Sequence, residues 1–281
     1  MLKIIKNFKY LTIGLILSCF GVVLAMFIIN EKNKDDLEET YTQYTYKIQE
    51  EIYSLIQDKV NTTNSIALSA TINLTDINQL LNEDSPLHED IDSLSFKLRE
   101  HTRFKNVWFQ IINTEGISVY RNWTNKKGDS LYKKRNDVRK VLKSKEMSNT
   151  MSVGKYDMTF KSMVPIFNGE KFIGIFEVIT HFNSIAKSLL KHNIHAVIVA
   201  NKKYKKQLTN ALTNTFIGEY YVANLNAKPL LVDYLAKNDL EYILNTKEKY
   251  LIDQTNNYFI SDYEIPDVNG ENLGNIIFFK S

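Results

Sequence analysis

An uncharged apolar run near the N-terminus constrains this chain more than any other feature. The run extends over residues 10–30 and reads YLTIGLILSCFGVVLAMFIIN. In a helix, about 20 apolar residues span the ~30 Å hydrocarbon core of a bilayer. The apolar region of a secretory signal is shorter and ends at a small-residue cleavage site, which this run lacks. The sequence therefore predicts a retained transmembrane helix over residues 10–30.

The flanking charges predict how this helix is oriented. Lys3, Lys6 and Lys9 precede the run, whereas acidic residues predominate just after it. Positive flanks stay on the cytoplasmic side, so residues 1–9 are expected in the cytoplasm and the rest of the chain outside it. The only cysteine is Cys19, inside the run, so the outer part has no disulfide. This favours a bacterial periplasm, and we expect a single-pass protein of the bacterial inner membrane.

The charge balance of the outer part argues against nucleic acid as a partner. The whole chain has a formal net charge of +3, which the three lysines before the run account for. The part beyond residue 30 is therefore formally neutral. Nucleic-acid binding needs clustered lysine and arginine, so we expect no nucleic-acid partner.

Residues 31–75 are predicted to form a long stalk helix. No glycine or proline interrupts residues 31–70, and apolar residues recur at steps of three and four. The members of this seam are Leu37, Tyr41, Tyr44, Ile48, Ile52 and Leu55. Such a seam is typical of an amphipathic or coiled helix. We expect it to bury against a sheet of the same chain or against the same helix of a second chain, as in a homodimer.

Beyond residue 75 the pattern predicts an α+β fold in two tandem domains, residues 76–192 and 193–281. In the first, we predict helices over 76–82, 87–100, 137–145 and 182–192 and strands over 106–112, 117–123, 150–155, 158–167 and 172–180. In the second, we predict strands over 196–200, 216–223, 250–253, 258–265 and 273–279, a helical turn at 202–208 and one helix over 229–244. The segments FNGEKFIGIFEV and PDVNGENLGNIIFF are an internal echo: each has an Asn-Gly-Glu turn and then an apolar strand containing glycine. Both sheets are therefore expected to be antiparallel.

This order of elements resembles the double Cache sensor domain of bacterial membrane receptors, a tandem of two PAS-like folds. The similarity covers about residues 31–281 and is carried mostly by KNVWFQIINTEGISVYRNW and GKYDMTFKSMVPIFNGEKFIGIFEVITHFNSIAKSL. The resemblance implies an extracytoplasmic small-molecule sensing module of a chemoreceptor, histidine kinase or diguanylate cyclase. Residues 76–192 would be the membrane-distal, ligand-binding domain and residues 193–281 the membrane-proximal one. Such receptors continue into an output domain, which this sequence lacks, so a separate signalling partner or a longer receptor is expected.

The resemblance also implies a binding site. Several amino-acid-sensing members use an Arg-x-Trp pair on one strand and an aspartate on a later strand, which Arg121, Trp123 and Asp157 match. An arginine beside an aromatic plate suits a ligand carboxylate, and Asp157 would accept a ligand ammonium. The expected ligand is an amino acid, an amine or a carboxylate. The competing hypothesis is an exposed ion pair between Arg121 and Asp157, with Trp123 in the core.

Three further residues complete the predicted site. Strand alternation places Thr159 on the same face as Asp157, and Tyr156 adjoins them. Glu177 interrupts an apolar strand, so its carboxylate is expected in a pocket, in an ion pair or on a solvated face, of which we favour the last. The predicted ligand-binding set is Arg121, Trp123, Tyr156, Asp157, Thr159 and Glu177.

No pattern for catalysis, a cofactor or a metal stands out in the sequence. The five histidines have no metal-ligand spacing, and neither a nucleophile motif nor a phosphate-binding glycine loop is present. We therefore predict a protein that is not an enzyme and that uses no cofactor or metal. The rival hypothesis is a ligand-free periplasmic scaffold or dimerisation protein anchored in the inner membrane.

Overall fold

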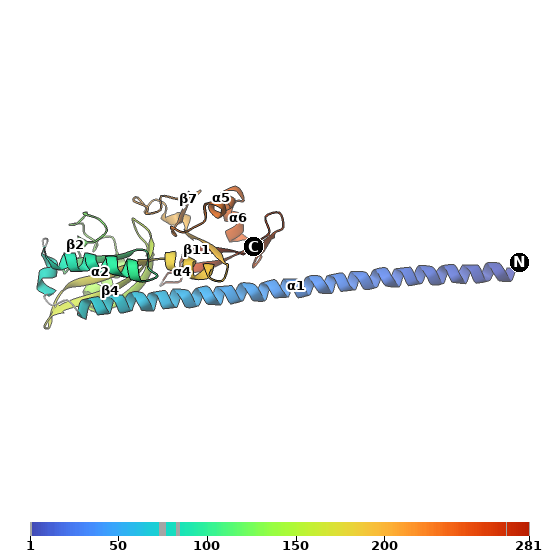
Figure 1. Cartoon of the computed structure of the whole chain (residues 1–281), viewed down its shortest axis with the longest axis horizontal. Helices are drawn as coiled ribbons and strands as arrows, with labels where there is room; N and C mark the ends of the chain where they lie inside the picture. Colours follow the sequence, from blue (N-terminus) through green and yellow to red (C-terminus); the bar gives the residue numbers. More distant parts are fainter. Residues whose placement is uncertain (1, 73–76, 83–84, 268, 281) are drawn as a thin grey trace. The chain divides into compact units, whose positions relative to one another are not determined.

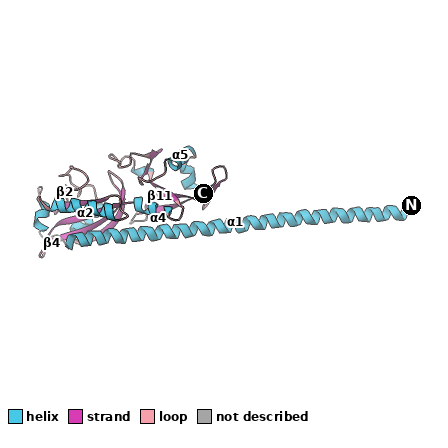
Figure 2. Cartoon of the chain, viewed as in Figure 1, coloured by secondary structure: helices cyan, strands magenta, loops and turns pink. Residues whose placement is uncertain are grey.

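The structure is a computed structural model that describes residues 2–72, 77–82, 85–267 and 269–280. It contains one long helix, two antiparallel sheets and several short helices (Figure 1, Figure 2). The chain divides into two compact units, residues 1–48 and residues 49–281.

Residues 2–48 belong to the helix α1, Leu2–Ile72. This helix includes residues 31–72 of the predicted stalk, and residues 73–75 lie outside the described residues. The side chains of residues 1–25 and 28, which make up most of the predicted membrane span, are also outside them. In the part of the chain that is described, no helical stretch has the length and apolarity that crossing a membrane requires.

The first sheet of the unit 49–281 has five antiparallel strands in the order β2-β1-β5-β4-β3. Its strands are β1 Val107–Asn113, β2 Ser118–Arg121, β3 Ser148–Val153, β4 Met158–Asn168 and β5 Lys171–His181. All five were predicted within a few residues of these bounds. The long hairpin β4–β5 forms the middle of the sheet together with β1.

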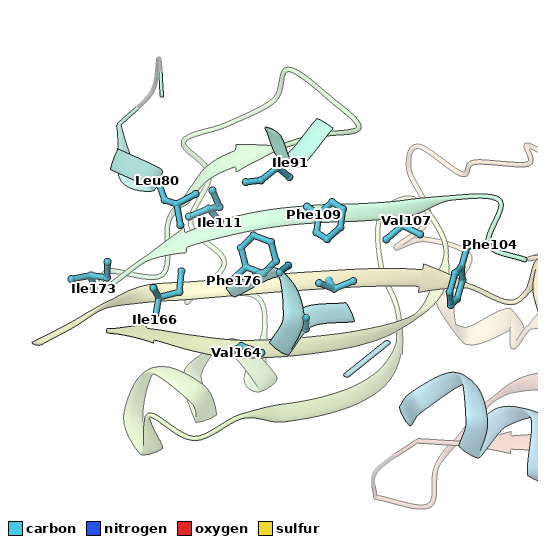
Figure 3. Close-up of a cluster of buried hydrophobic side chains, with 13 residues drawn as sticks. Leu80, Ile91, Phe104, Val107, Phe109, Ile111, Val164, Ile166, Ile173 and Phe176 are labelled. Atoms are coloured by element: carbon cyan, nitrogen blue, oxygen red, sulfur yellow. The ribbon is translucent and has the colours of Figure 1, made fainter. Parts of the chain in front are cut away.

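Helices cover one face of this sheet. They are η1 Ile77–Leu81, α2 Leu87–His101 and the end of α1. The predicted helix over 76–82 is thus a short 3-10 turn in the described residues. Alternate residues of β1, β4 and β5 point into this layer, where Phe109, Val164 and Phe176 are buried with Leu80 and Ile91 (Figure 3). The face is apolar because every second residue of each strand is apolar.

A stripe along α1 attaches this helix to the first sheet. The stripe consists of Ile52, Ile56, Lys59, Thr63, Ala67 and Ala70, all buried. Its steps of four and three residues continue the predicted seam. Thr63 Oγ1 lies 2.7 Å from Thr180 Oγ1 of β5, and the Lys59 ammonium nitrogen lies 3.7 Å from the centroid of the Phe104 ring. Of the predicted seam residues, Ile52 belongs to this stripe, whereas Leu55 is half-buried outside it, so the contact with the first sheet is made mainly by residues beyond the predicted seam.

The opposite face of the first sheet is only partly covered. Helix α3, Asn136–Ser144, packs Val138 and Val141 against Met163 and Ile175 near one end of the strands. The remainder of this face carries the polar residues Gln110, Lys161 and Glu177, which alternate with the apolar residues of the helical layer. The part of this face that α3 does not cover forms the floor of the candidate site.

The second sheet has the order β7-β8-β6-β11-β10-β9 and follows α4, Asn183–Leu190. Its strands are β6 His195–Ala200, β7 Phe216–Ile217, β8 Tyr220–Val222, β9 Leu251–Asp253, β10 Tyr258–Pro266 and β11 Asn272–Lys280, and its short helices are η2 Lys202–Tyr204, α5 Pro229–Lys237 and α6 Leu240–Asn245. Two predictions here were wrong. The strand predicted over 216–223 is a tight hairpin that turns at Gly218, φ +61°, and the helix predicted over 229–244 is broken at Asp239, φ +51°.

The two sheets repeat one plan, as the echo in the sequence predicted. Gly174 of β5 and Gly274 of β11 each lie in the second strand of a long hairpin. A Cβ at Gly174 would lie 2.4 Å from the carbonyl oxygen of Ile112, and one at Gly274 would lie 2.0 Å from that of Val199. Both strands therefore require glycine where the neighbouring strand approaches most closely.

Candidate functional site

A cavity of about 660 Å³ lies on the partly covered face of the first sheet. Its floor is a row of directly opposed residues on four neighbouring strands: Trp108, Ile179, Lys161 and Thr150. Directly opposed residues point to the same side of a sheet. Its walls come from the loop 121–137, the segment 150–157, Gln207 and the turn that holds Asp267 and Asn269. The cavity is therefore built by one sheet and closed by neighbouring loops.

Aromatic rings form one wall. The rings of Trp108 and Trp123 stack with their centroids 4.8 Å apart and their planes 10° apart. Tyr156 meets both rings edge-on, with centroids at 6.0 Å and 6.2 Å. The indole Nε1 of Trp123 is buried and has no acceptor among the described residues. A flat or apolar ligand can pack on this wall, and a ligand oxygen would satisfy the indole N–H.

Arg121 lies at the edge of the aromatic wall, but its charge is already neutralised. Its Nη1 donates to Asp129 Oδ1 at 2.6 Å and to the carbonyl of Lys126 at 2.7 Å. With the side-chain amide of Gln110 in its better orientation, the Gln110 oxygen accepts from Arg121 Nε and Nη2 at 3.0 Å and 3.1 Å. Burial alone would raise the pKa of Asp129, but the hydrogen bond and charge of Arg121 lower it. Arg121 therefore shapes this end of the cavity as a member of an ion pair.

A buried ion cluster lies at the α3 end of the site. Glu177 is fully buried, and its carboxylate receives two hydrogen bonds from Arg135, at 2.9 Å and 2.5 Å. Arg135 also donates to both oxygens of Asp137, at 3.0 Å and 2.6 Å. Burial opposes the charge on Asp137, yet the Arg135 guanidinium holds the pKa of that carboxyl well below its usual range. The favoured expectation of a solvated Glu177 was wrong, because loop 121–137 covers this part of the sheet.

Lys161 is the cation on the floor of the cavity, and it has one hydrogen-bond partner. Its Nζ donates to Ser152 Oγ at 2.6 Å, and no carboxylate oxygen is paired with it among the described residues. Burial and the nearby charge of Arg135 lower the pKa of Lys161 to about 8, although the charges of Asp137 and Glu177 act in the opposite direction. An ammonium group has three N–H donors, so Lys161 has donors left for a ligand.

Asp157 lines the cavity, but its carboxylate is bonded to a histidine and to the backbone. Its Oδ2 lies 2.6 Å from His181 Nδ1, and its Oδ1 accepts from the backbone N–H of Met158. Both side chains are almost fully buried. Burial raises the pKa of Asp157, against the effect of its hydrogen bonds. His181 in turn supports the edge of the Trp108 ring, with centroids 4.3 Å apart. Asp157 thus holds the aromatic wall in place through His181.

The segment 153–157, one wall of the cavity, is bonded to the second sheet's domain. The backbone N–H of Asn210 donates to the carbonyl of Lys155 at 3.0 Å, and that of Leu212 donates to Tyr156 at 2.7 Å. Tyr221 of β8 lies near Asp157, and burial together with the Asp157 charge raises the pKa of the Tyr221 hydroxyl. The cavity wall is therefore also part of the contact between the two sheets' domains.

Five of the six predicted site residues line this one cavity: Arg121, Trp123, Tyr156, Asp157 and Thr159. Glu177 lies beneath this cavity, where its carboxylate is paired with Arg135. Sequence reasoning missed Trp108, Gln110 and Lys161 as floor residues and Arg135 as a loop contribution. The sequence did contain a pattern that indicates the floor residues, because polar residues at alternate positions of apolar strands must gather on one face.

On the equivalent face of the second sheet, the position that corresponds to Glu177 is filled by an apolar side chain. Counting three residues on from the shared glycine, Glu177 of β5 corresponds to Ile277 of β11, which is packed in a core with Ile260 and Phe279. A smaller cavity of about 380 Å³ lies at the edge of this core, beside Asp262 and Glu264. Within the described residues, no group of acidic, histidine or cysteine side chains is arranged to hold a metal ion.

The chain matches a family model described as the double sensory domain of two-component sensor kinase over residues 42–281. This confirms the predicted resemblance to double Cache sensors. No curated protein matches the chain.

Solved structures of sensor domains are similar to this chain at low identity. The V. cholerae histidine kinase DctB sensor domain is 11% identical over 84% of this chain and 95% of its own, with a TM-score of 0.45. The ligand-binding domain of the Campylobacter jejuni chemoreceptor Tlp3 in complex with L-valine is 15% identical over 88% and 95%, with a TM-score of 0.44. The E. coli DcuS sensor domain is 13% identical over 47% and 97%, with a TM-score of 0.35.

Proposed function

We propose a ligand-sensing mechanism for this chain from the premise that it belongs to the family of double sensory domains of two-component sensor kinases. The ligand is a small molecule that binds in the cavity of the first sheet, within residues 76–192. The domain of residues 193–281 receives the binding signal. The chain itself carries out no reaction on the ligand.

One observation carries this proposal. The cavity of the first sheet, about 660 Å³, is lined by donors and rings, while on the corresponding face of the second sheet Ile277 fills the position of Glu177 and the cavity is smaller, about 380 Å³. A buried indole N–H without an acceptor costs free energy unless a bound molecule supplies one. The aromatic wall, the unused donors of Lys161 and the volume together fit a bound small molecule.

The predicted site residues take two kinds of role in this proposal. Trp123, Tyr156 and Thr159 contact the ligand, with Arg121 at the edge of the same surface. Asp157 and Glu177 are positioning residues, because each is buried and bonded to a neighbouring side chain. Asp157 orients Trp108 through His181, and Glu177 fixes Arg135 above the floor.

The contact between the two domains is the proposed route by which ligand binding in the cavity is transmitted. Residues 153–157 line the cavity and are hydrogen-bonded to residues 207–213 of the second domain. A ligand that pulls this segment toward the aromatic wall must also shift the second domain or break those bonds. Binding would therefore favour one of two arrangements of the domains.

The membrane anchor and the assembly belong to the same proposal. Residues 10–30 would hold the protein in the bacterial inner membrane, with residues 1–9 in the cytoplasm and both sheets in the periplasm. The stalk seam within residues 31–48 would pair with that of a second copy in a homodimer. A separate signalling partner, or a longer receptor, would carry the response onward.

The two tryptophans of the chain give a direct test, since both lie in the cavity wall. A small-molecule library is screened by tryptophan emission of the purified full-length protein. A ligand should change the emission saturably, and Thr150→Phe, which fills the cavity, should weaken its binding at least about tenfold.

Asn149→Phe is the matched control for this test. Asn149 adjoins Thr150 on β3 but is exposed and does not line the cavity. A ligand that bound both variants equally well, or a library without any saturable change, would contradict the proposed function.

A further inference from the structure

We infer that the ligand of this cavity is a small organic anion whose negative group binds Lys161 and Ser152, with its apolar part on the tryptophan stack. This inference rests on the proposed function, because it names the ligand class of the same site. It assigns the recognition of charge to β4 and β3, and not to the Arg121 and Asp157 pair predicted from the sequence.

The two arginines of the cavity are already paired with carboxylates, whereas Lys161 is bonded only to a hydroxyl. Arg121 is bonded to Asp129, and Arg135 is bonded to both Asp137 and Glu177. Lys161 Nζ has one bonded partner, a neutral hydroxyl at 2.6 Å. A buried ammonium is stable only when its charge and its donors are satisfied. Arg135 and Lys161 together balance the charges of Asp137 and Glu177, but two of the three N–H donors of Lys161 have no partner among the described groups, and a ligand anion would accept from them.

The rim of the cavity adds to the positive field. Lys126, Lys134 and Lys155 all line it, and the charge of Lys126 lowers the pKa of Lys155, with a smaller effect from Lys134. These ammonium groups repel one another across the entrance. An anion is attracted by such an arrangement, whereas an amine is repelled by it. Asp267 also lines the cavity and Asp129 is paired with Arg121, so the three lysines outnumber the remaining acidic group and the entrance favours an anion.

The spacing of the floor row sets the dimensions of the ligand. Trp108 on β1, Ile179 on β5 and Lys161 on β4 are directly opposed neighbours. Adjacent strands lie ~4.8 Å apart, so the Trp108 and Lys161 backbones are about 10 Å apart. The apolar Ile179 lies between them. A carboxylate at Lys161 that is joined to a ring or a short apolar chain spans this row.

The experiment uses matched compounds of known charge. Benzoate, phenylacetate and hexanoate are each titrated beside the corresponding neutral amide and the corresponding amine, with the tryptophan emission of the full-length protein as the signal. We expect the acids to bind more tightly than the amides and the amines. Lys161→Met should weaken acid binding by about tenfold to a hundredfold, the usual range for a charge-assisted hydrogen bond.

Two further variants control this result. Lys161→Arg keeps the charge and should retain most of the acid affinity, whereas Lys133→Met removes an exposed lysine of the same domain and should change it little. Thermal unfolding of each free variant reports whether the fold is intact. An unfolded Lys161→Met leaves Ser152→Ala as the test, since it removes one hydroxyl and should also weaken acid binding.

Proton uptake gives an independent readout. A bound carboxylate stabilises the charged form of Lys161, which faces Arg135, Asp137 and Glu177 and is partly neutral just above pH 8. Acid binding to the native protein should therefore take up a fraction of a proton at that pH, seen by calorimetry in buffers of different ionisation enthalpy. Lys161→Arg should take up none.

The outcomes separate this inference from the proposed function. Amides or amines that bind as tightly as acids, or acid affinity that Lys161→Met leaves unchanged, would overturn the anion assignment and leave the sensing function standing. No emission change with a compound of any charge would count against both.

Discussion

Replacing Lys59 with methionine is expected to stabilise the protein, and to do so less as the pH rises. Lys59 lies on the buried stripe of α1, with 2% of its surface exposed, and its nitrogen rests on the Phe104 ring. Burial lowers the pKa of Lys59 from 10.5 to about 6, assisted by the charge of Arg103. Methionine has a similar length and packs well against an aromatic ring, so Lys59→Met removes the amine without leaving a large cavity.

The direction and the size of this change in folding stability follow from proton linkage. Between pH 6 and pH 10.5 the unfolded chain binds a proton at Lys59 that the folded protein does not. The stability contributed by this group is thus fully present above the unfolded pKa and falls by ~1.4 kcal/mol for each pH unit below it, until the folded pKa is reached. At pH 7 the loss is on the order of 5 kcal/mol, an upper limit for the stabilisation of Lys59→Met.

Denaturant unfolding at pH 6, 7, 8 and 9 measures this effect. The native protein should gain stability from pH 6 to pH 9 relative to Lys59→Met, so the two curves should converge. Lys97→Met, at an exposed lysine of α2, should follow the native curve. Parallel curves for the native protein and Lys59→Met would refute the reasoning, because they would mean that Lys59 stays charged in the folded state.

Three other substitutions test the close packing at Gly174, the buried ion cluster and the contact between the two domains. Gly174→Ala should unfold the protein at a clearly lower temperature, since its Cβ would lie 2.4 Å from a backbone oxygen, whereas Gly154→Ala meets no atom closer than 3.7 Å and should be tolerated. Glu177→Gln breaks a fully buried ion pair and should cost about 3–5 kcal/mol in denaturant unfolding, while Glu170→Gln at an exposed turn should cost almost nothing. Tyr221→Phe should leave ligand affinity within a few fold of native yet reduce ligand-induced protection of residues 207–213 from hydrogen exchange; undiminished protection would contradict the proposed path.

The strands of both sheets were predictable because their side chains alternate. In β1, Val107, Phe109 and Ile111 face the helical layer while Trp108 and Gln110 face the cavity, a period of two that is visible in the sequence. The repeat of the two sheets was also visible, in the turn and the glycine that each long hairpin shares. Periodicity therefore located these elements to within a few residues.

Interruptions of a helix or a strand were less predictable. The pattern of residues 229–244 fits one amphipathic helix, but Asp239 takes a left-handed conformation and starts a second helix by accepting a hydrogen bond from Glu241. Gly218 likewise turns one apparent strand into a hairpin. Apolar periodicity survives such breaks, since both halves still bury the same face against one core.

The cavity could be predicted in part. The residues Trp123, Tyr156 and Thr159 were found from strand alternation and the family resemblance, and they do line one cavity. What the sequence could not supply was the pairing of charges. Arg121 and Asp157 look like ligand anchors until tertiary contacts bring Asp129 to one and His181 to the other.

The most direct test of the central claim is a two-dimensional proton–nitrogen spectrum of the full-length protein, recorded with and without a ligand from the emission screen. Only two indole N–H signals are expected, from Trp108 and Trp123. If the ligand binds in the first sheet's cavity, both signals should move, and that of Trp123 should shift as its unpartnered N–H gains an acceptor. Indole signals that stay in place at a saturating ligand concentration would contradict the account, because the ligand would then be bound elsewhere.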